Sequence, residues 1–130
     1  MTQRLPFEEV HPTQLYLSSQ KLAEIFEWFD FDSPNYDPLP AFHYDGTWYL
    51  SDGHTRAFAA GLAGAETLRI EQDHDIREEH DFEVYLTCIE WCADADVETV
   101  HDLRGRVVEP ATYQTRWIDR CQSLDDYSDE

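Results

Sequence analysis

One short stretch of the chain concentrates side chains that bind anions. It follows an aromatic-rich run at residues 47–50 and consists of Asp52, Gly53, His54, Thr55 and Arg56. Arginine presents a planar fork of N–H donors to phosphate, threonine adds a hydroxyl donor, and histidine adds a ring donor. The carboxylate of Asp52 can orient a hydroxyl group or a metal-bound water. The stretch therefore predicts a phosphate site at residues 53–56, with Asp52 beside it.

The backbone around Gly53 suits the same purpose. Asp52-Gly53 breaks a strand, and the alanine-rich run that follows predicts a helix over residues 55–63, ended by Gly64. Glycine permits a sharp turn and a close ligand, and the first N–H groups of a helix point outward at the positive end of its dipole. In the alternative interpretation, Asp52 only caps the helix and Arg56 pairs with one of the many carboxylates.

The elements that position this stretch predict an α+β fold. Asp45-Gly46 lies between two aromatic-rich runs and predicts a type I′ hairpin, because both turn residues then adopt positive φ. We expect a small mixed sheet with helices packed on it. Its strands are expected near residues 5–10, 41–44, 47–50 and 67–70.

Helical periodicity marks three further segments. A helix after Ser18 or Ser19 that ends near Asp30 would bury one stripe: Leu22, Ile25, Phe26 and Phe29. After the charged stretch at residues 72–81, a second helix would bury Tyr85, Cys88, Ile89 and Cys92. A third helix, after Pro110, would bury Tyr113, Trp117, Cys121 and Leu124. Residues 1–72 are expected to form the core, and residues 73–130 a helical extension packed on the same domain.

Other residues that can do chemistry have structural explanations. Cys88 and Cys92 share a helix face, which favours buried small side chains over a redox pair. No metal site is predicted, because the spacing of the metal-capable cluster fits neither zinc nor calcium: His74, Asp75, His80 and Asp81. Core packing is expected of the four tryptophans, with a base-stacking platform as the alternative: Trp28, Trp48, Trp91 and Trp117.

The charge of the chain is strongly negative. It carries 28 acidic residues against eight arginines and a single lysine, Lys21, for a formal net charge of −19. This composition resembles that of halophilic archaea, because molar salt screens the self-repulsion of such a surface. Broad nucleic-acid binding is not expected without clustered cations. No apolar run is long enough to span a bilayer or to act as an ordinary export signal, so we expect a soluble, cytoplasmic protein.

Residues 37–64 also resemble a known family. The stretch reads DPLPAFHYDGTWYLSDGHTRAFAAGLAG. It is similar to the central segment of the ParB/sulfiredoxin-like superfamily, in which a hairpin leads into a phosphate loop and an alanine-rich helix. The branch it resembles carries Asp-Gly-His-[His/Thr]-Arg. More weakly, the resemblance runs from Leu5 to about Ile70, and it implies a nucleotide-phosphate contact for the loop residues.

The departures from this family matter as much as the matches. Sulfiredoxins use a loop cysteine as nucleophile, and His54 stands in its place, which argues against sulfinic acid reduction. The chromosome-partitioning members use a Gly-Glu-Arg-Arg loop for CTP and a downstream DNA reader, and neither is found here. The free-serine kinases add an N-terminal glutamate as base, but Glu8 and Glu9 are out of register with it. His11 can face the loop from the first strand, behind the residues that contact the phosphate.

Two classes of function follow. In the first, a small ParB-like protein binds a phosphate or nucleotide at residues 53–56, in support of phosphoryl transfer or nucleotide hydrolysis. Its ligand would be a nucleoside di- or triphosphate with Mg²⁺, and Asp52 would hold the ion or a hydroxyl group. In the second, a non-catalytic interaction module or DNA-associated regulatory module retains the fold. The sequence assigns neither a catalytic residue nor an oligomeric state.

Overall fold

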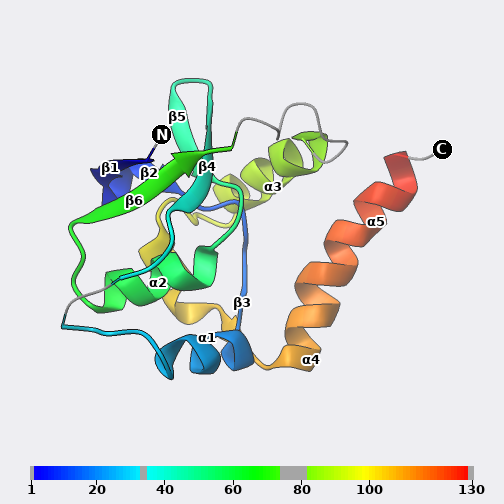
Figure 1. Ribbon diagram of the computed structural model, residues 1–130. Helices are drawn as coiled ribbons and strands as arrows, with labels where there is room; N and C mark the ends of the chain where they lie inside the picture. The colour runs from blue at the N-terminus through cyan, green and yellow to red at the C-terminus, as the bar shows by residue number, and fades with distance from the viewer. Residues whose placement is uncertain (1, 33–34, 74–81, 129–130) are drawn as a thin grey trace.

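A five-stranded mixed sheet forms one layer of the protein (Figure 1). The computed structural model describes residues 2–32, 35–73 and 82–128, with side chains as far as residue 123. The strands are β1 (Thr2–Pro6), β2 (Val10–His11), β4 (Leu39–Tyr44), β5 (Thr47–Leu50) and β6 (Thr67–Gln72). They lie in the order β1-β6-β4-β5-β2. The β1·β6 and β4·β5 pairs are antiparallel, whereas β4·β6 and β2·β5 are parallel.

The hairpin between β4 and β5 is the one predicted from Asp45-Gly46. Asp45 has φ 51° and Gly46 has φ 80°, as a type I′ turn requires. The register pairs Ala41 with Leu50, and both side chains are fully buried. The hairpin therefore fixes where β5 ends, and the Asp52-Gly53 turn follows directly from that end.

The prediction of one continuous strand at residues 5–10 is wrong. β1 ends at Pro6, a 3₁₀ turn covers Phe7–Glu9, and β2 then resumes with two residues. The chain changes direction at this turn, so that β1 pairs with β6 and β2 pairs with β5. It also places the Phe7 ring in the core, 4.3 Å from the His101 ring centroid to centroid. Burial of an aromatic side chain thus outweighs strand regularity here.

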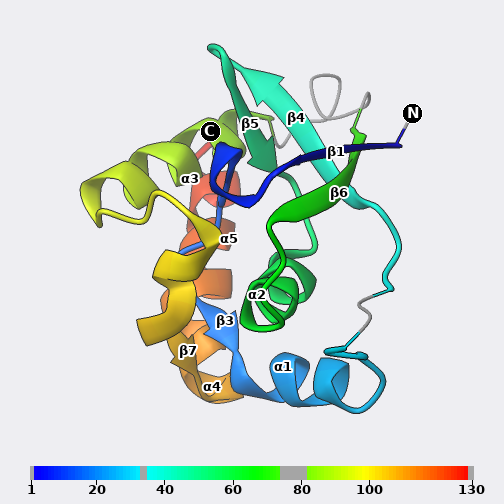
Figure 2. The same cartoon turned by 90° about the vertical axis from the view of Figure 1, so that its left-hand side faces the viewer.

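Two helices lie below the sheet and in contact with each other, α1 (Ser19–Phe26) and α2 (His54–Leu62) (Figure 2). α1 is shorter than predicted, and the predicted apolar stripe is only partly buried. Leu22 and Phe29 are buried, but Phe26 is 43% exposed and packs on the Phe31 ring at the surface. α2 matches the predicted helix within one residue at each end. Gly64 follows its cap with φ 87°, as expected for the residue that ends it.

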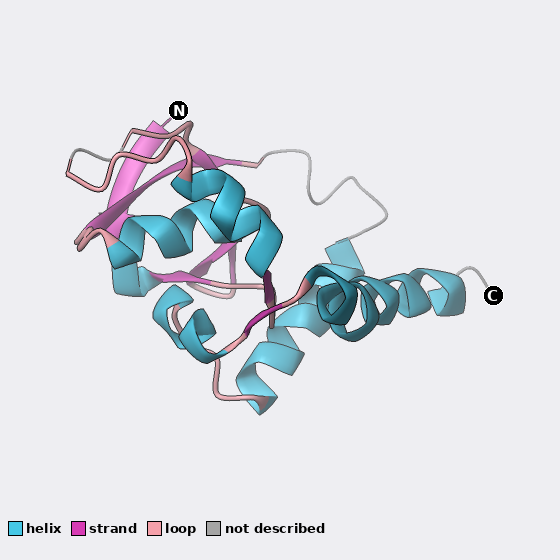
Figure 3. Ribbon diagram, turned by 90° about the horizontal axis from the view of Figure 1, so that it is seen from below, coloured by secondary structure: helices cyan, strands magenta, loops and turns pink. Residues whose placement is uncertain are grey.

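The C-terminal half adds helices and a second, two-stranded sheet. Its helical segments are α3 (Phe82–Asp94), a 3₁₀ helix (Val100–Gly105), α4 (Pro110–Tyr113), a π-helical segment (Gln114–Ile118) and α5 (Asp119–Ser128). β7 (Val107–Val108) pairs in parallel with β3 (Leu17–Ser18), which joins this half to the chain before α1. α5 extends away from the rest of the fold toward the C-terminus (Figures 1 and 3). The division at residue 72 stays a prediction.

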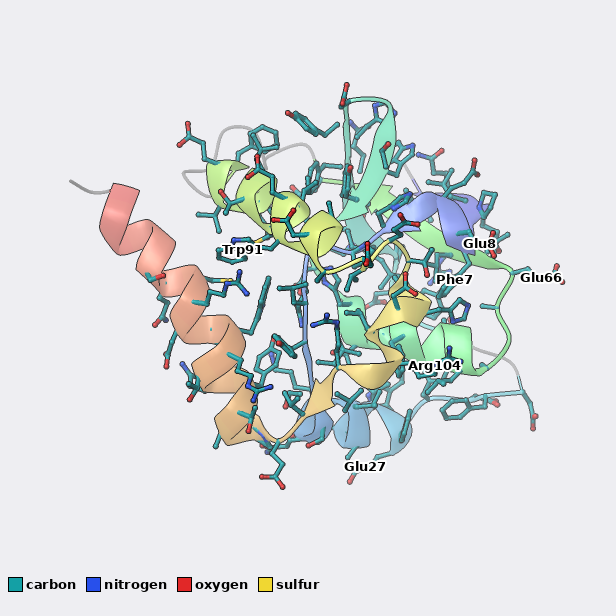
Figure 4. The ribbon with its side chains drawn as sticks, turned by 180° about the vertical axis from the view of Figure 1, so that it is seen from behind. Phe7, Glu8, Glu27, Glu66, Trp91 and Arg104 are labelled. Atoms are coloured by element: carbon teal, nitrogen blue, oxygen red, sulfur yellow. The ribbon has the colours of Figure 1, made fainter. Side chains whose placement is uncertain are left out.

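Aromatic contacts hold α3 against the C-terminal helices. The rings of Trp91 and Trp117 meet edge to face at 6.0 Å, and the Arg120 guanidinium lies 3.8 Å from the Trp91 ring centroid. Figure 4 shows Trp91 on α3, on the side that faces α5. Cys88 and Cys92 are each 3% exposed, which confirms that they are buried. The side chain of Leu124 and the cluster at residues 74–81 lie outside the described residues.

Candidate functional site

Gly53 lies in the candidate site, at the turn between β5 and α2. It adopts φ 78° and ψ 21°, a left-handed conformation, immediately before α2 begins at His54. A Cβ atom at this position would lie 2.8 Å from Nη2 of Arg56 and 2.8 Å from Cδ2 of Leu39. Glycine is therefore required twice, by the backbone conformation and by the close approach of the guanidinium.

Substituting Gly53 with alanine should destabilise the protein more than the same substitution at Gly64. Both residues have positive φ, but a Cβ at Gly64 meets nothing within 4 Å. The strain alone costs about 1–2 kcal/mol, and the two contacts at residue 53 add to it. Urea unfolding of Gly53→Ala and Gly64→Ala measures the difference. Equal losses of stability would show that the contacts with Arg56 and Leu39 impose no constraint.

A hollow of about 310 Å³ opens at the N-terminus of α2. All five residues predicted from the sequence line it, so the structure brings the whole stretch to one place. Residues that the sequence did not place at the phosphate loop complete its wall: Gln14, Lys21, Ile25, Trp28 and Tyr113. The hollow therefore joins the N-terminus of α2 to one face of α1 and to the end of α4.

Lys21 brings a second cation to the hollow. Lys21 and Ile25 are four residues apart and lie on one side of α1, and Trp28 follows in the turn after the helix. The ammonium of Lys21 lies 5.5 Å from the centroid of the Tyr113 ring. Tyr113 in turn accepts a hydrogen bond from the Gln14 amide at 3.0 Å. Burial, with smaller effects of Cys121 and Asp52, raises the pKa of Tyr113 to about 12, so the phenol stays neutral beside the lysine.

Arg56 reaches the hollow from the first turn of α2. It is half-buried, and its Nη1 donates a long hydrogen bond of 3.5 Å to the Asp37 carbonyl. Within the described ranges, its guanidinium thus contacts a backbone carbonyl rather than a carboxylate. The alternative that Arg56 serves only to pair with an acidic side chain gains no support from this contact. Thr55, also half-buried, lines the same hollow.

His54 is buried and bound to the loop before α1. It is 4% exposed, and its Nε2 accepts a hydrogen bond of 2.9 Å from the Thr13 backbone N–H. Burial lowers the pKa of His54 to about 4, against a weaker opposing effect of Asp52. The ring is therefore neutral near pH 7, with its proton on Nδ1. A contact with phosphate through this side chain stays a prediction, and it would have to use Nδ1.

Asp52 lies between two hollows. A second hollow, of about 540 Å³, shares Gln14, Asp52, His54 and Tyr113 with the first. Its floor is more apolar and comes from the C-terminal helices: Val84, Tyr85, Cys88, Trp117, Ile118 and Cys121. Asp52 is exposed, so its carboxylate is open to ions and ligands. A molecule in the second hollow would face the hollow at Gly53 across Asp52.

A magnesium ion fits this arrangement only as a companion of the ligand. In the part of the chain that the structure describes, no group of three metal-capable side chains lies together. Mg²⁺ commonly takes one or two carboxylates together with substrate phosphates. Asp52 fits the role of one such carboxylate.

The cysteines are closer to the site than their sequence positions indicate. Cys88 and Cys121 line the second hollow, although the loop precedes them by more than thirty residues. A hydrogen bond with Cys121, and then burial, raise the pKa of the Cys88 thiol, while burial raises that of Cys92 to about 12. Thiols held in the protonated form are poor nucleophiles. The absence of sulfiredoxin-type cysteine chemistry stays a prediction.

The N-terminal residues considered from the sequence lie elsewhere. His11 packs its ring 5.8 Å from that of Tyr49 and lines neither hollow; Thr13, two residues later, makes the contact with His54. Glu8 lies on the 3₁₀ turn after β1, away from α4 and α5 (Figure 4). A general base from this segment is therefore not part of the site.

A further hollow, of about 560 Å³, lies at the opposite end of α2. It contains Arg4 and Arg69, but also Glu66 and Asp32. The C-terminus of α2 presents the negative end of its dipole there. Arg69 is already hydrogen-bonded to the Tyr36 carbonyl. These features make it less suited to an anion than the hollow at Gly53.

Comparisons with known proteins support the fold. No protein-family model matches the sequence, and neither does any curated protein. Among solved structures, the chain is similar to sulfiredoxin from Arabidopsis thaliana, with 25% identity and a TM-score of 0.43 over 56% of this chain and 84% of that one. It is also similar to protein Atu1540 from Agrobacterium tumefaciens, with 16% identity and a TM-score of 0.53 over 85% of this chain and 63% of that one.

A third similar structure is the C-terminally truncated chromosome-partitioning protein ParB from Caulobacter crescentus, in complex with CTP-gamma-S. The identity is 16% and the TM-score 0.49, over 72% of this chain. The chain spans 63% of the Agrobacterium protein and 53% of the Caulobacter protein. The structure has the α+β fold expected from the sequence, and the Agrobacterium protein, at a TM-score of 0.53, shares that fold.

Proposed function

We propose that the protein binds the phosphate groups of a small molecule, a nucleoside di- or triphosphate, in the hollow at Gly53. One observation carries the proposal: Lys21 and Arg56, from two different helices, line one hollow at the N-terminus of α2. The first N–H groups of α2 add donors at the positive end of the helix dipole. In a chain of net charge −19, a hollow with two cations and a helix N-terminus is suited to an anion.

The family resemblance supports the same ligand. Asp-Gly-His-Thr-Arg matches the phosphate-loop pattern of one branch of the ParB/sulfiredoxin-like superfamily, and it lies after a hairpin and before an alanine-rich helix, as in that pattern. Members of the superfamily bind nucleotide phosphates at this loop. Because of their positions in this pattern, Gly53, Thr55 and Arg56 would make the contacts with the nucleotide phosphates. For His54, the backbone N–H is better placed to contribute than the ring, because Nε2 is occupied by Thr13.

Phosphoryl transfer or hydrolysis is the reaction that the site supports best if it turns over. Arg56, Lys21 and the helix N-terminus would neutralise phosphate charge. Asp52 would hold either a hydroxyl group or Mg²⁺, which when bound neutralises charge on the phosphates. An acceptor would lie in the second hollow, because Asp52 lines both hollows. The proposal does not include direct binding of nucleic acid over a broad surface of the protein.

A non-catalytic module is the second candidate function, as an interaction partner or a DNA-associated regulator. It is favoured by the burial of two groups that could otherwise react: His54 is 4% exposed with its Nε2 bonded to the Thr13 N–H, and Cys88 is 3% exposed. In this case the nucleotide would act as a regulatory ligand. Single-turnover assays with the intact protein distinguish the two, because only the enzyme converts bound nucleotide to product.

The proposal also covers the cell compartment and the salt concentration in which the protein works. The described helices include none that could cross a membrane. We infer from the acidic composition that the protein works in the cytoplasm of a halophilic archaeon, and measurements therefore belong in molar KCl. At that ionic strength the Debye length is about 3 Å, so only cations close to the phosphate contribute strongly.

Thermal unfolding in molar KCl tests phosphate binding. ATP, ADP, CTP or GTP at about 100 times its dissociation constant should stabilise the wild-type protein by roughly 2.7 kcal/mol, a shift of several degrees. Arg56→Ala should reduce that shift to roughly a third, because the loss of one of the two cations weakens binding about thirtyfold. Arg104→Ala, which removes an exposed arginine from the 3₁₀ helix at Val100–Gly105, should retain it. No shift of the wild-type protein with any of the four nucleotides would refute the proposal.

A further inference from the structure

Trp28 is an unusual tryptophan, because most of its surface faces water. Its exposed fraction is 53%, the largest among the described large apolar side chains. Trp117 is buried, and Trp48 and Trp91 are half-buried. The expectation of core packing thus holds for Trp117 but not for Trp28. An exposed indole beside a ligand site is a feature typical of recognition rather than stability.

The position of Trp28 connects it to the phosphate hollow. A small hollow of about 270 Å³ adjoins that site, and its wall includes Trp28, Tyr36, Asp37 and Arg56. Trp28 and Arg56 line both this hollow and the one at Gly53. A ligand with its phosphates at Lys21 and the start of α2 could therefore extend between these two side chains into the smaller hollow.

The chemistry of the smaller hollow suits a nucleobase. A planar ring stacks on the indole face, and such stacking accepts any base, because every base has a π-face. Arginine also stacks its guanidinium plane on flat ring systems. At the edge of the hollow, the carboxylate of Asp37 and the carboxamide of Asn35 offer hydrogen-bonding groups.

We propose that Trp28 forms a base-stacking subsite, in which the base of a nucleotide lies in the hollow between Trp28 and Arg56 while its phosphates occupy the hollow at Gly53. This inference rests on the proposed phosphate site and names its ligand class. It assigns Trp28 to nucleoside recognition and leaves phosphate binding to Lys21, Arg56 and the N-terminus of α2.

Calorimetry with two probes separates these roles. ATP contains a base and a triphosphate, whereas inorganic tripolyphosphate lacks the base. Trp28→Ala should weaken ATP binding about tenfold and leave tripolyphosphate binding within about twofold of wild type. Trp28→Phe keeps an aromatic face and should recover most of the ATP affinity. Phe26→Ala is the matched control, because Phe26 is an exposed aromatic residue of α1 that lines neither hollow.

The outcomes distinguish failure of the stacking subsite from failure of the phosphate site. If tripolyphosphate binds and Trp28→Ala weakens both probes by the same factor, the stacking subsite is wrong and the phosphate site stands. If Trp28→Ala changes neither probe, the same conclusion holds. If tripolyphosphate and ATP both fail to bind the wild-type protein, the phosphate site is wrong and the subsite falls with it. A selective loss of ATP affinity, restored by Trp28→Phe, supports the subsite.

Discussion

The Lys21→Ala, Arg56→Ala double variant should bind tripolyphosphate about a thousandfold more weakly than the wild-type protein. Each hydrogen bond between a charged donor and phosphate contributes about 1.5–3 kcal/mol, so two cations account for roughly three orders of magnitude in the dissociation constant. Both side chains line the hollow at Gly53, one from α1 and one from α2. Calorimetry of both single variants and the double variant in molar KCl measures the loss.

Two controls make this result specific. Arg56→Lys keeps the charge but loses the planar fork, and should recover part of the affinity. Arg104→Ala changes the net charge of the protein by the same amount as Arg56→Ala, at an exposed position outside the hollow. If Arg104→Ala weakens binding as much as Arg56→Ala, the effect comes from overall charge and not from the hollow.

Acid should destabilise the wild-type protein more than a variant that lacks His54. The pKa of His54 is lowered by burial from its ordinary 6.5 to about 4 in the folded protein. Between these values the unfolded chain binds a proton that the folded protein excludes, so stability is lost as pH falls through this window. From about pH 7 to about pH 5, the loss attributable to His54 is roughly 2 kcal/mol.

His54→Gln is the variant that isolates this effect. A glutamine carboxamide can accept the Thr13 N–H in place of Nε2, and it does not titrate. Urea unfolding of both proteins across this pH range should show that the stability advantage of wild type shrinks with acid. His43→Gln is the control, because His43 is exposed on β4. Parallel pH profiles for wild type and His54→Gln would contradict the buried, neutral assignment.

The local features of the site were predictable because they depend on neighbouring residues. Asp45-Gly46 dictates its turn through positive φ, and the alanine-rich run after Gly53 forms α2 within one residue of the expected ends. Together they determine that a helix N-terminus follows directly from the hairpin. That much of the proposed phosphate site is encoded in fewer than twenty consecutive residues.

The rest of the site depends on contacts between distant segments. Lys21 was notable only as the single lysine; its place in the hollow follows from the packing of α1 on α2, which periodicity does not reveal. From the sequence, the ring of His54 was expected to be a donor to phosphate. In the structure its Nε2 instead accepts a hydrogen bond from the backbone N–H of Thr13, 41 residues earlier in the chain. Likewise, the approach of Cys121 to Cys88 depends on how α5 packs on α3.

A crystal structure of the wild-type protein soaked with ATP in molar KCl tests the central claim most directly. The account predicts phosphate density in the hollow at Gly53, in contact with the Lys21 ammonium, the Arg56 fork and the first N–H groups of α2. Phosphate density at the other end of α2, beside Arg4 and Arg69, would contradict it, as would an empty hollow at Gly53 in a crystal saturated with the nucleotide.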